Sequence, residues 1–361
     1  MPTASGPVFV VGSMRSGSTL LRLVLDSHPD IAIGAETGFM RGLRAVKDIP
    51  NWRAGNRWYE RLGWTEPEID ERLREFYGGL FERYAAAQGK PRWGEKTPFH
   101  TEHVPEMARV FPDAVFVGIV RHPGAVASSL RKNFHWRFPD GLEYWTRIND
   151  ALVRSGTELG DRFTLCRYED LVLEEEPVLR ALVGWLGERW DPCMLQHHRV
   201  QREKGARGAE GGTRADVPVE PERAVRWADS LDDHDVLALQ DTAALAGFFG
   251  YAPLDPDVRH RLGPDAETGP CLVTGTDLAR RRHEWSDRVT FERRPPAALP
   301  DGTVEELAGR LAHAESVIAR VRSRRAVRLA DAARTIQHGR SLQDLRRAWT
   351  LVRGPRRDGT R

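Results

Sequence analysis

Three short apolar runs, at residues 8–11, 115–120 and 163–167, are each followed by polar residues and then by a helical pattern. Runs of this length without alternating polar positions are typical of strands that are buried on both faces. Strands that alternate with helices indicate a parallel sheet, because each helix returns the chain to the same edge. The chain is therefore predicted to be an α/β protein with a central parallel sheet flanked by helices.

The apolar positions also locate the helices. The first is predicted over residues 17–27 and ends before Pro29, because the residue before a proline disfavours the α region. Four residues at helical spacing form its apolar face: Leu20, Leu21, Val24 and Leu25. Further helices are expected from Pro123 onward and over 141–160, 175–190 and 231–249, the last of these closing the globular body. Region 41–90, rich in Trp, Arg and Glu, is interpreted as inserted helices that contact the acceptor.

Composition divides the chain into three parts. Residues 1–254 form the predicted globular domain, which includes a glycine-rich mobile loop at 203–219. Residues 255–300 contain several prolines and are expected to be a linker. Residues 301–361 form a mostly helical extension with fourteen arginines against seven acidic residues. Its apolar seam predicts that it packs on the body or self-associates. Its positive charge leaves peripheral binding to an anionic membrane or to an acidic glycan as alternatives. Its scarcity of aromatic residues argues against binding to nucleic acid.

The overall composition excludes several classes of function. With 361 residues, 40% of them hydrophobic, the chain can bury a sizeable core, and a formal net charge of +2 implies no polyanionic partner. The scattered Cys166, Cys193 and Cys271 suggest neither a disulfide scaffold nor a zinc site. No apolar run approaches the roughly 18 residues of a membrane span, and the first strand begins too early to leave room for a signal peptide. We therefore expect a cytoplasmic protein.

The most informative motif lies between the first strand and the first helix. Residues 12–19 read GSMRSGST, with Gly12, Gly17 and Thr19 at the glycine and hydroxyl positions of the phosphate loop G-x-x-x-x-G-K-[ST]. Ser18 stands where that loop has its lysine, and Arg15 places a cation inside the loop instead. Backbone N–H groups at a helix N-terminus suit a phosphate. The motif thus indicates a P-loop-type sheet and a nucleotide whose reactive group is not a Mg²⁺-bound triphosphate.

Further motifs follow this loop in a defined order. They are LDSHPD at 25–30, ET at 36–37, EKTPF at 95–99, Arg121 with Ser129 eight residues later, and RYEDL at 167–171. Together with the loop, they resemble the sulfotransferases that depend on 3′-phosphoadenosine-5′-phosphosulfate (PAPS). The likeness is strongest to the branch that contains tyrosylprotein sulfotransferases and their bacterial relatives. It covers roughly residues 7–250 and leaves the tail outside.

The resemblance implies a site for each anionic end of PAPS. Five loop residues would hold the 5′-phosphosulfate: Arg15, Ser16, Gly17, Ser18 and Thr19. Arg15 would offer a bidentate fork there, although it could also be a loop cation that faces solvent. Arg121 and Ser129 would grip the 3′-phosphate together. The plainer alternative is that Arg121 caps the edge of the sheet and Ser129 is an ordinary helical serine.

The resemblance also implies catalytic roles for Glu36, Lys96 and Arg15. Glu36 would take the proton of the acceptor hydroxyl, a contribution of about 10²–10⁴-fold where the groups are within hydrogen-bond reach. It could instead cap a helix or pair with Arg41. His100 and His103 are rival bases, although both are expected on the surface of a helix that begins near residue 98. Lys96 would stabilise the bridging oxygen or the sulfuryl group, with pairing to Glu95 or Glu102 as the alternative.

The remaining assignments concern the adenosine and the closing loop. Tyr168 follows the third strand and is implied to contact the adenosine, or else it is a buried tyrosine with its hydroxyl on a backbone group. Thr213 and Arg214 lie in the glycine-rich loop, where the family closes over its nucleotide, although the sequence match is loose there and a plain surface loop is the alternative. Trp227 is expected in the core. No cluster of His, Cys and Asp has metal-ligand spacing, so no metal is predicted.

These motifs predict an enzyme that moves a sulfuryl group from PAPS to a hydroxyl acceptor by in-line displacement and leaves 3′,5′-bisphosphoadenosine (PAP). The acceptor is expected to be a glycan, a lipid-linked sugar or a small metabolite. A P-loop kinase is the alternative from another reaction class, but Ser18 in place of the lysine argues against it. A nucleotide-binding module that has lost catalysis is a third possibility, and the presence of Glu36 and Lys96 argues against that.

Overall fold

The computed structural model describes residues 6–48, 57–205, 209–210, 213–251 and 272–289. All of them belong to one compact unit, Met1–Arg293. The predicted helical tail at 301–361 lies outside the described residues. Within the described residues no helix is long and apolar enough to cross a membrane.

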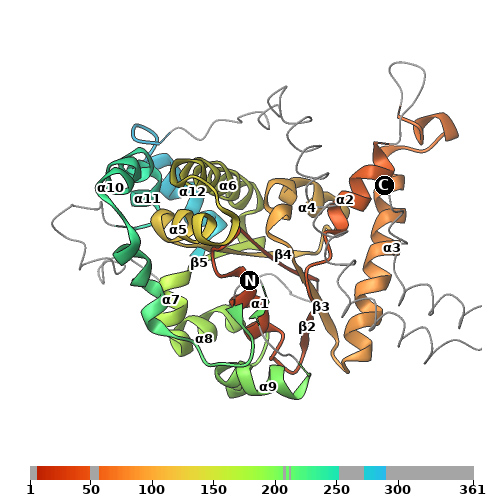
Figure 1. Cartoon of the computed structure of the whole chain (residues 1–361). Coiled ribbons are helices and arrows are strands. Elements are labelled where there is room, and N and C mark those ends of the chain that lie inside the picture. The colour runs from red at the N-terminus through yellow and green to blue at the C-terminus, as the bar shows by residue number, and fades with distance from the viewer. Residues whose placement is uncertain (1–5, 49–56, 206–208, 211–212, 252–271, 290–361) are drawn as a thin grey trace, which may run out of the picture. The chain divides into compact units, whose positions relative to one another are not determined.

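A six-stranded sheet forms the centre of this unit, with the strand order β2-β3-β1-β4-β5-β8 (Figure 1). The strands are β1 (Val8–Gly12), β2 (Ile31–Ile33), β3 (Arg92–Lys96), β4 (Val115–Val120), β5 (Phe163–Arg167) and β8 (Val273–Thr274). The first five are parallel, and β8 pairs antiparallel with β5. The predicted α/β class and the three predicted strands, which are β1, β4 and β5, are confirmed.

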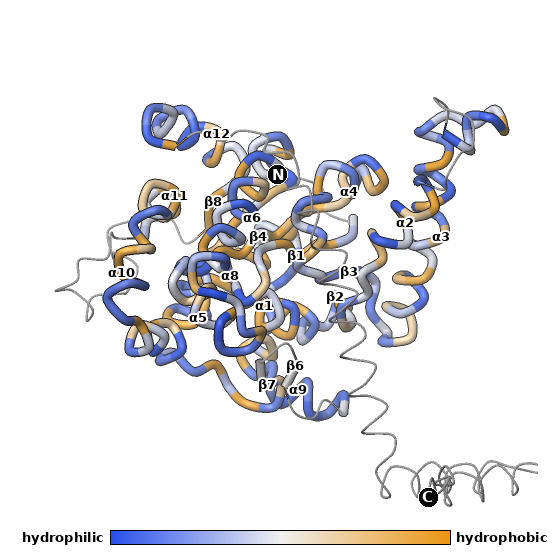
Figure 2. The backbone as a smooth tube through the Cα atoms, turned by 45° about the horizontal axis from the view of Figure 1, so that its top comes forward, coloured by the Kyte–Doolittle hydropathy of each residue, from blue (hydrophilic) through white to orange (hydrophobic). Residues whose placement is uncertain are grey.

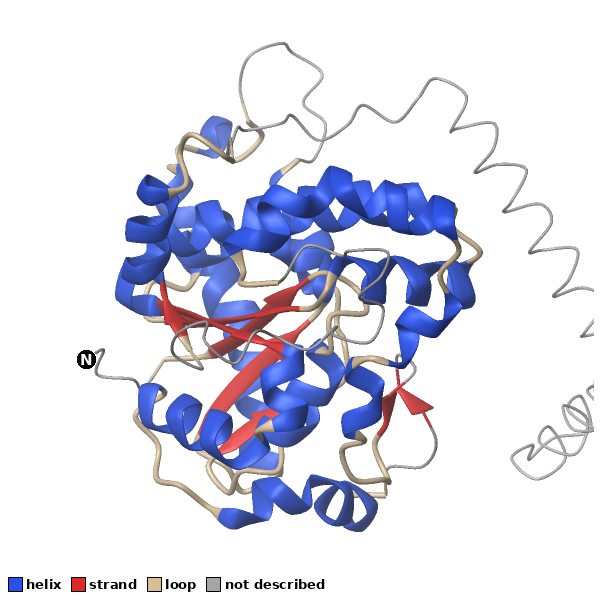
Figure 3. Cartoon of the chain, turned by 90° about the vertical axis from the view of Figure 1, so that its left-hand side faces the viewer, coloured by secondary structure: helices blue, strands red, loops and turns tan. Residues whose placement is uncertain are grey.

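Helices cover both faces of the sheet (Figures 1 and 3). On one face lie α1 (Ser18–Leu25), α7 (Tyr168–Leu173), α8 (Glu175–Trp185) and α9 (His197–Glu203). On the other lie α4 (Val104–Val110), α5 (Pro123–Phe134), α6 (Phe138–Leu159) and α12 (Gly275–Glu284). Alternate residues of β1 serve the two cores, since Val8 and Val10 pack with α1 and α8 whereas Phe9 and Val11 pack with α6.

The region after β2 contains α2 (Phe39–Lys47) and α3 (Glu66–Ala87), as the inserted-helix interpretation of region 41–90 predicts. The buried Asp70 on α3 pairs with residues of α2 and α4, where Lys47 Nζ donates to Asp70 Oδ1 at 2.7 Å and Arg109 Nε donates to Asp70 Oδ2 at 2.7 Å. Polar and apolar residues are mixed along α3, while the apolar stretches of the chain converge on the sheet (Figure 2).

Two expectations need correction. The predicted helix at 231–249 is two short helices, α10 (Asp233–Leu239) and α11 (Ala243–Phe248), and it does not close the body. Residues 272–289, expected within a linker, instead form β8 and α12. The backbone of α12 packs tightly on α6, because a Cβ on Gly275 would lie 2.3 Å from the carbonyl oxygen of Gly156. The local sequence pattern did not predict β8, because this strand is only two residues long.

Candidate functional site

The loop between β1 and α1 places the first turn of α1 against a cavity. Gly17 precedes the helix with a φ of 98°, a left-handed conformation that favours glycine. A Cβ on Gly17 would also lie 2.3 Å from the ring of Tyr168. Arg15 has a φ of 68°, which is uncommon for a residue with a side chain and is typical of functional loops. The helix begins at Ser18, so its unbonded N–H groups form a site that suits an anion.

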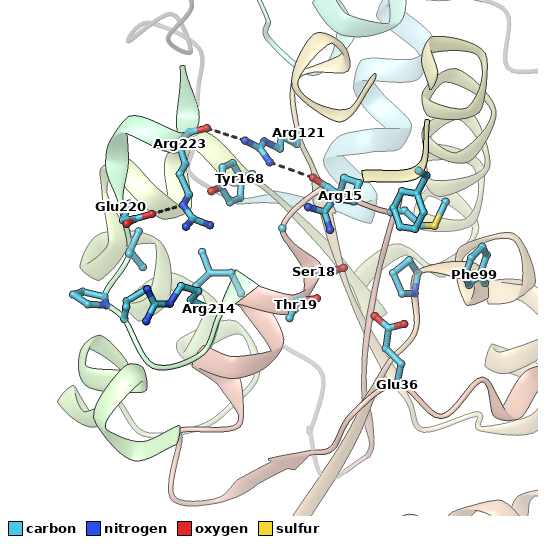
Figure 4. A pocket seen from close by; sticks show the side chains of 18 residues that line it. Arg15, Ser18, Thr19, Glu36, Phe99, Arg121, Tyr168, Arg214, Glu220 and Arg223 are labelled. Carbon is cyan, nitrogen blue, oxygen red and sulfur yellow. Dashed lines mark hydrogen bonds and ion pairs between the residues drawn. The ribbon is translucent and has the colours of Figure 1, made fainter. Parts of the chain in front are cut away.

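The cavity has a volume of about 350 Å³ and gathers residues from distant parts of the chain (Figure 4). Four arginines and a tyrosine lie on one side: Arg15, Arg121, Arg214, Arg223 and Tyr168. The other side carries Glu36 among apolar side chains: Met14, Pro98, Phe99 and Phe134. The first turn of α1 lies between the two sides (Figure 4). The cavity therefore has a cationic half and a half where one carboxylate faces apolar groups.

The structure brings together the two predicted phosphate-binding regions. Arg15 Nε donates to Ser129 Oγ at 2.7 Å, and Arg121 Nη1 donates to the carbonyl oxygen of Arg15 at 3.3 Å. The Arg121 guanidinium also stacks on the Tyr168 ring, 4.2 Å from its centroid. Burial, and then the charges of Arg121 and Arg223, lower the pKa of Arg15. Such crowding of cations is relieved by a bound anion, so this half fits a ligand with more than one phosphate.

Glu36 and Lys96 lie in contact although they are sixty residues apart. Lys96 is fully buried at the end of β3, and its ammonium group donates to Glu36 Oε1 and, at 3.0 Å, to Thr19 Oγ1. The Glu36 side chain is 40% exposed on the cavity wall. Within the described part of the chain, the partner of Glu36 is thus Lys96 rather than Arg41. One ammonium group joins the first turn of α1 to the carboxylate side of the cavity.

The two rival histidines do not line this cavity. His100 was expected on the surface, and that expectation is wrong because it is buried with Nδ1 3.0 Å from Glu95 Oε2. His103 is partly exposed beside Arg44, and burial together with the charge of Arg44 lowers its pKa. Both residues belong to a 3₁₀ helix, Pro98–His103. The sequence pattern did not predict which side chains of this helix are buried. Of the three candidate bases, Glu36 is the one that lines the cavity.

The structure places Tyr168 in the wall of the cavity and Thr213 in a short strand of the glycine-rich loop. Tyr168 is buried at the start of α7, its ring lines the cavity between Gly17 and Arg121, and burial raises its pKa. Thr213 begins β7 (Thr213–Arg214), which pairs with β6 (Ala209–Glu210). Arg214 follows it and reaches the cavity while paired with Asp216.

Trp227 is a core residue, as the sequence predicts. It is buried and stacks on His122 with ring centroids 4.4 Å apart. Its indole N–H donates to the carbonyl oxygen of Ala224 at 2.8 Å. It therefore supports the segment that follows the glycine-rich loop.

Residues 217–223, at the end of the glycine-rich loop and just after it, supply cavity residues that the sequence did not indicate. Arg121 Nη2 donates to the carbonyl oxygen of Arg223 at 2.8 Å, and the Arg223 side chain pairs with Glu220. No motif marks these residues, because an arginine in a polar loop is common in this chain. They are identified by their position in the cavity wall and, for Arg223, by its contact with Arg121.

The residues present fit a nucleotide with two separated anionic ends, held by the helix N-terminus and by Arg121. Among the described residues, no group of three or more His, Cys, Asp or Glu side chains is placed to hold a metal ion.

Comparisons with known proteins agree with these features. A family model described as "Sulfotransferase family" matches residues 7–192. The chain is 27% identical over 265 residues to protein-tyrosine sulfotransferase 1 of Danio rerio, and the alignment covers 69% of this chain and 72% of that protein. It is 28% identical over 266 residues to protein-tyrosine sulfotransferase 2 of Gallus gallus, covering 69% of each. Among solved structures, the sulfotransferase domain from the curacin biosynthetic pathway is 19% identical, with a TM-score of 0.45, covering 67% of this chain and 97% of that domain.

Proposed function

This chain belongs to the sulfotransferase family and transfers a sulfuryl group from PAPS to a hydroxyl acceptor, and we propose which of its residues do so. The observation that carries the proposal is the position of Lys96, whose ammonium group contacts Thr19 on the donor side and Glu36 on the acceptor side. A residue between the two halves of the cavity can stabilise charge that develops between donor and acceptor. PAPS, when bound, supplies the activated sulfuryl group.

The phosphate loop would hold the 5′-phosphosulfate end. Ser18 and Thr19 begin α1, where backbone N–H groups and the helix dipole favour negative charge. The neighbouring Ser16 is buried, with its hydroxyl donating to the Ser13 carbonyl oxygen at 2.7 Å, so its part is to fix the loop. Arg15 adds a guanidinium that can stabilise the leaving phosphate.

The 3′-phosphate would lie against Arg121, with Ser129 close by. Arg121 is held by backbone carbonyls of Arg15 and Arg223, so its guanidinium is oriented before a ligand arrives. Tyr168 would contact the adenosine with its ring. Thr213, Arg214 and Arg223 belong to residues 213–223, which we propose close this side of the site.

Glu36 would act as the general base. Its carboxylate lies on the cavity wall with one oxygen on Lys96, so it can accept the proton of an acceptor hydroxyl. Lys96, fully buried, would stabilise the charge that develops on the bridging oxygen as the sulfuryl group leaves. This arrangement needs no covalent enzyme intermediate, because the acceptor oxygen attacks the sulfur in line.

The acceptor would enter over the apolar half of the cavity. Phe99 is 58% exposed and Phe134 is 49% exposed, and both line the cavity beside Glu36. Exposed aromatic faces pack on the rings of sugars and of aryl groups alike. We propose a glycan, a lipid-linked sugar or a small metabolite as acceptor. The curated relatives are named for protein tyrosine, so tyrosine peptides belong in the same assay.

The experiment that tests this function follows ³⁵S from labelled PAPS into each acceptor class, together with PAP binding by calorimetry. Sulfuryl transfer to a hydroxyl acceptor and tight PAP binding are expected, with ATP binding much more weakly. Mg²⁺-dependent ATP binding in place of PAP binding would contradict the site assignment and favour a kinase.

A further inference from the structure

Glu95, next to Lys96 on β3, is a buried carboxylate that does not line the cavity. Its Oε1 accepts hydrogen bonds from Thr37 Oγ1 at 2.9 Å, from Thr37 N at 3.3 Å and from Thr97 Oγ1 at 2.7 Å. Its Oε2 lies 3.0 Å from His100 Nδ1. The donors come from three segments, so one carboxylate ties the loop after β2 to the end of β3 and to the following 3₁₀ helix.

The environment keeps this carboxylate ionised although only 2% of the residue is exposed. Burial alone would raise the pKa of Glu95, but the hydrogen bonds from His100, Thr97 and Thr37 hold its pKa below the ordinary value. A buried charge is costly unless several donors satisfy it. The donors around Glu95 are therefore fixed in place by a strong common acceptor.

The chain connects this network directly to the catalytic candidates. Thr37 follows Glu36, and Lys96 follows Glu95, so any movement between Thr37 and Glu95 changes the contact between Glu36 and Lys96. Thr97 extends the same network by accepting from Gly38 N at 3.3 Å. A displacement of about 1 Å between reacting groups can cost about 10²-fold in rate.

The network also reaches the phosphate loop. Thr101 belongs to the same 3₁₀ helix as His100, and its hydroxyl accepts from Gly12 N at 2.8 Å. The end of β1 is thereby fixed to the helix that Glu95 holds through His100. The phosphate loop on the donor side and Glu36 on the acceptor side are therefore held by one network of hydrogen bonds.

We propose that Glu95 is a positioning residue for sulfuryl transfer, which holds Glu36 against Lys96 through its bonds to Thr37. This inference rests on the proposed roles of Glu36 and Lys96. It assigns no contact between Glu95 and either substrate. Because Thr37 is exposed on a loop, substitutions there disturb the core less than a change at the buried Glu95.

The first test compares Thr37→Val with Thr37→Ser in the full-length protein. Valine has the shape of threonine without the hydroxyl, so the bond to Glu95 Oε1 is lost and kcat should fall roughly tenfold. KM for PAPS and Kd for PAP should stay within about twofold, because the lost interaction concerns positioning and not binding. Thr37→Ser keeps the hydroxyl and should restore kcat. A normal kcat in Thr37→Val, or equal loss in Thr37→Ser, would overturn the proposal.

The second test uses the carboxylate itself. Glu95→Ala should lower kcat by about 10²-fold, and Thr37→Val added to it should cause little further loss because both changes break the same contact. Asp70→Ala is the matched control, since Asp70 is also buried, pairs with Lys47 and Arg109, and does not line the cavity. It should reduce thermal stability and leave kcat unchanged. An equal loss of kcat in Asp70→Ala, or additive losses in the double variant, would overturn the proposal.

Glu36→Ala, measured alongside, distinguishes the two possible failures. An impaired Glu36→Ala beside a normal Thr37→Val removes the positioning role alone. A normal rate in Glu36→Ala removes the base assignment and the positioning role with it. If Glu95→Ala does not fold, the Thr37 pair decides the question.

Discussion

Arg15 Nε donates a 2.7 Å hydrogen bond to Ser129 Oγ, joining the loop after β1 to helix α5 across 114 residues of sequence. The family resemblance assigns these two residues to opposite ends of one nucleotide, and both regions lie on the same edge of the sheet. The bond orients Arg15 before a ligand arrives. One molecule the size of an adenosine bisphosphate can therefore contact both regions.

Arg121→Ala should weaken PAP binding by about 10²-fold, because charge-assisted hydrogen bonds to phosphate contribute about 1.5–3 kcal/mol each. Isothermal titration calorimetry at fixed ionic strength measures the change. Arg131→Ala is the control, since Arg131 lies on α5 in an ion pair with Asp235 and outside the cavity. Unchanged PAP affinity in Arg121→Ala would refute the 3′-phosphate assignment.

Glu36→Gln should reduce kcat by about 10²–10⁴-fold and leave PAP affinity near normal, because an amide cannot accept the acceptor proton. The measurement is steady-state transfer of ³⁵S under saturating PAPS. Glu102→Gln provides the comparison, since Glu102 is a nearby carboxylate that pairs with Arg147 and does not line the cavity. If Glu36→Gln were fully active, the base would have to be sought elsewhere.

Gly17→Ala should destabilise the protein and abolish nucleotide binding. The new Cβ would lie 2.3 Å from the Tyr168 ring, at a φ of 98°. Gly63→Ala separates the two effects, because Gly63 has a φ of 81° and an added Cβ there would meet nothing within 4 Å. Gly63→Ala should cost about 1 kcal/mol from backbone strain alone, and Gly17→Ala should cost clearly more. Equal costs from calorimetric unfolding would contradict the close approach of Tyr168.

Glu175→Gln should stabilise the protein at alkaline pH. Burial raises the pKa of Glu175 from 4.5 to about 7, so the native state resists ionisation of this group. The stability that this group contributes is fully present below pH 4.5 and is lost as pH rises through about 7. Glutamine does not titrate and avoids this loss.

Thermal unfolding at pH 5 and pH 8 measures the effect of Glu175→Gln. The variant should gain over the wild type at pH 8 and show little difference at pH 5. Glu176→Gln is the control, because Glu176 is exposed and paired with Arg180 on the surface. A gain of equal size at both pH values would show that the carboxyl group does not titrate as described.

Local sequence pattern determined a large part of this fold. The apolar runs that became β1, β4 and β5, and the loop that leads into α1, are each explained by residues next to one another in the chain. Strands buried on both faces need continuous apolar runs, and a tight turn into a helix needs glycine, so both leave a local signal. The sequence also predicted the position of Arg121, because this residue directly follows the apolar run that became β4.

Tertiary structure decided what has no local signal. Strand β3 reads RWGEK, and it is buried because Glu95 and Lys96 meet partners from other segments. His100 is buried for the same reason, and Arg223 lines the cavity because its segment packs beside Arg121, which donates to the Arg223 carbonyl oxygen. A charged side chain can be buried only where distant residues supply its donors and acceptors. Such partners are chosen by packing across the sheet, which short-range pattern does not encode.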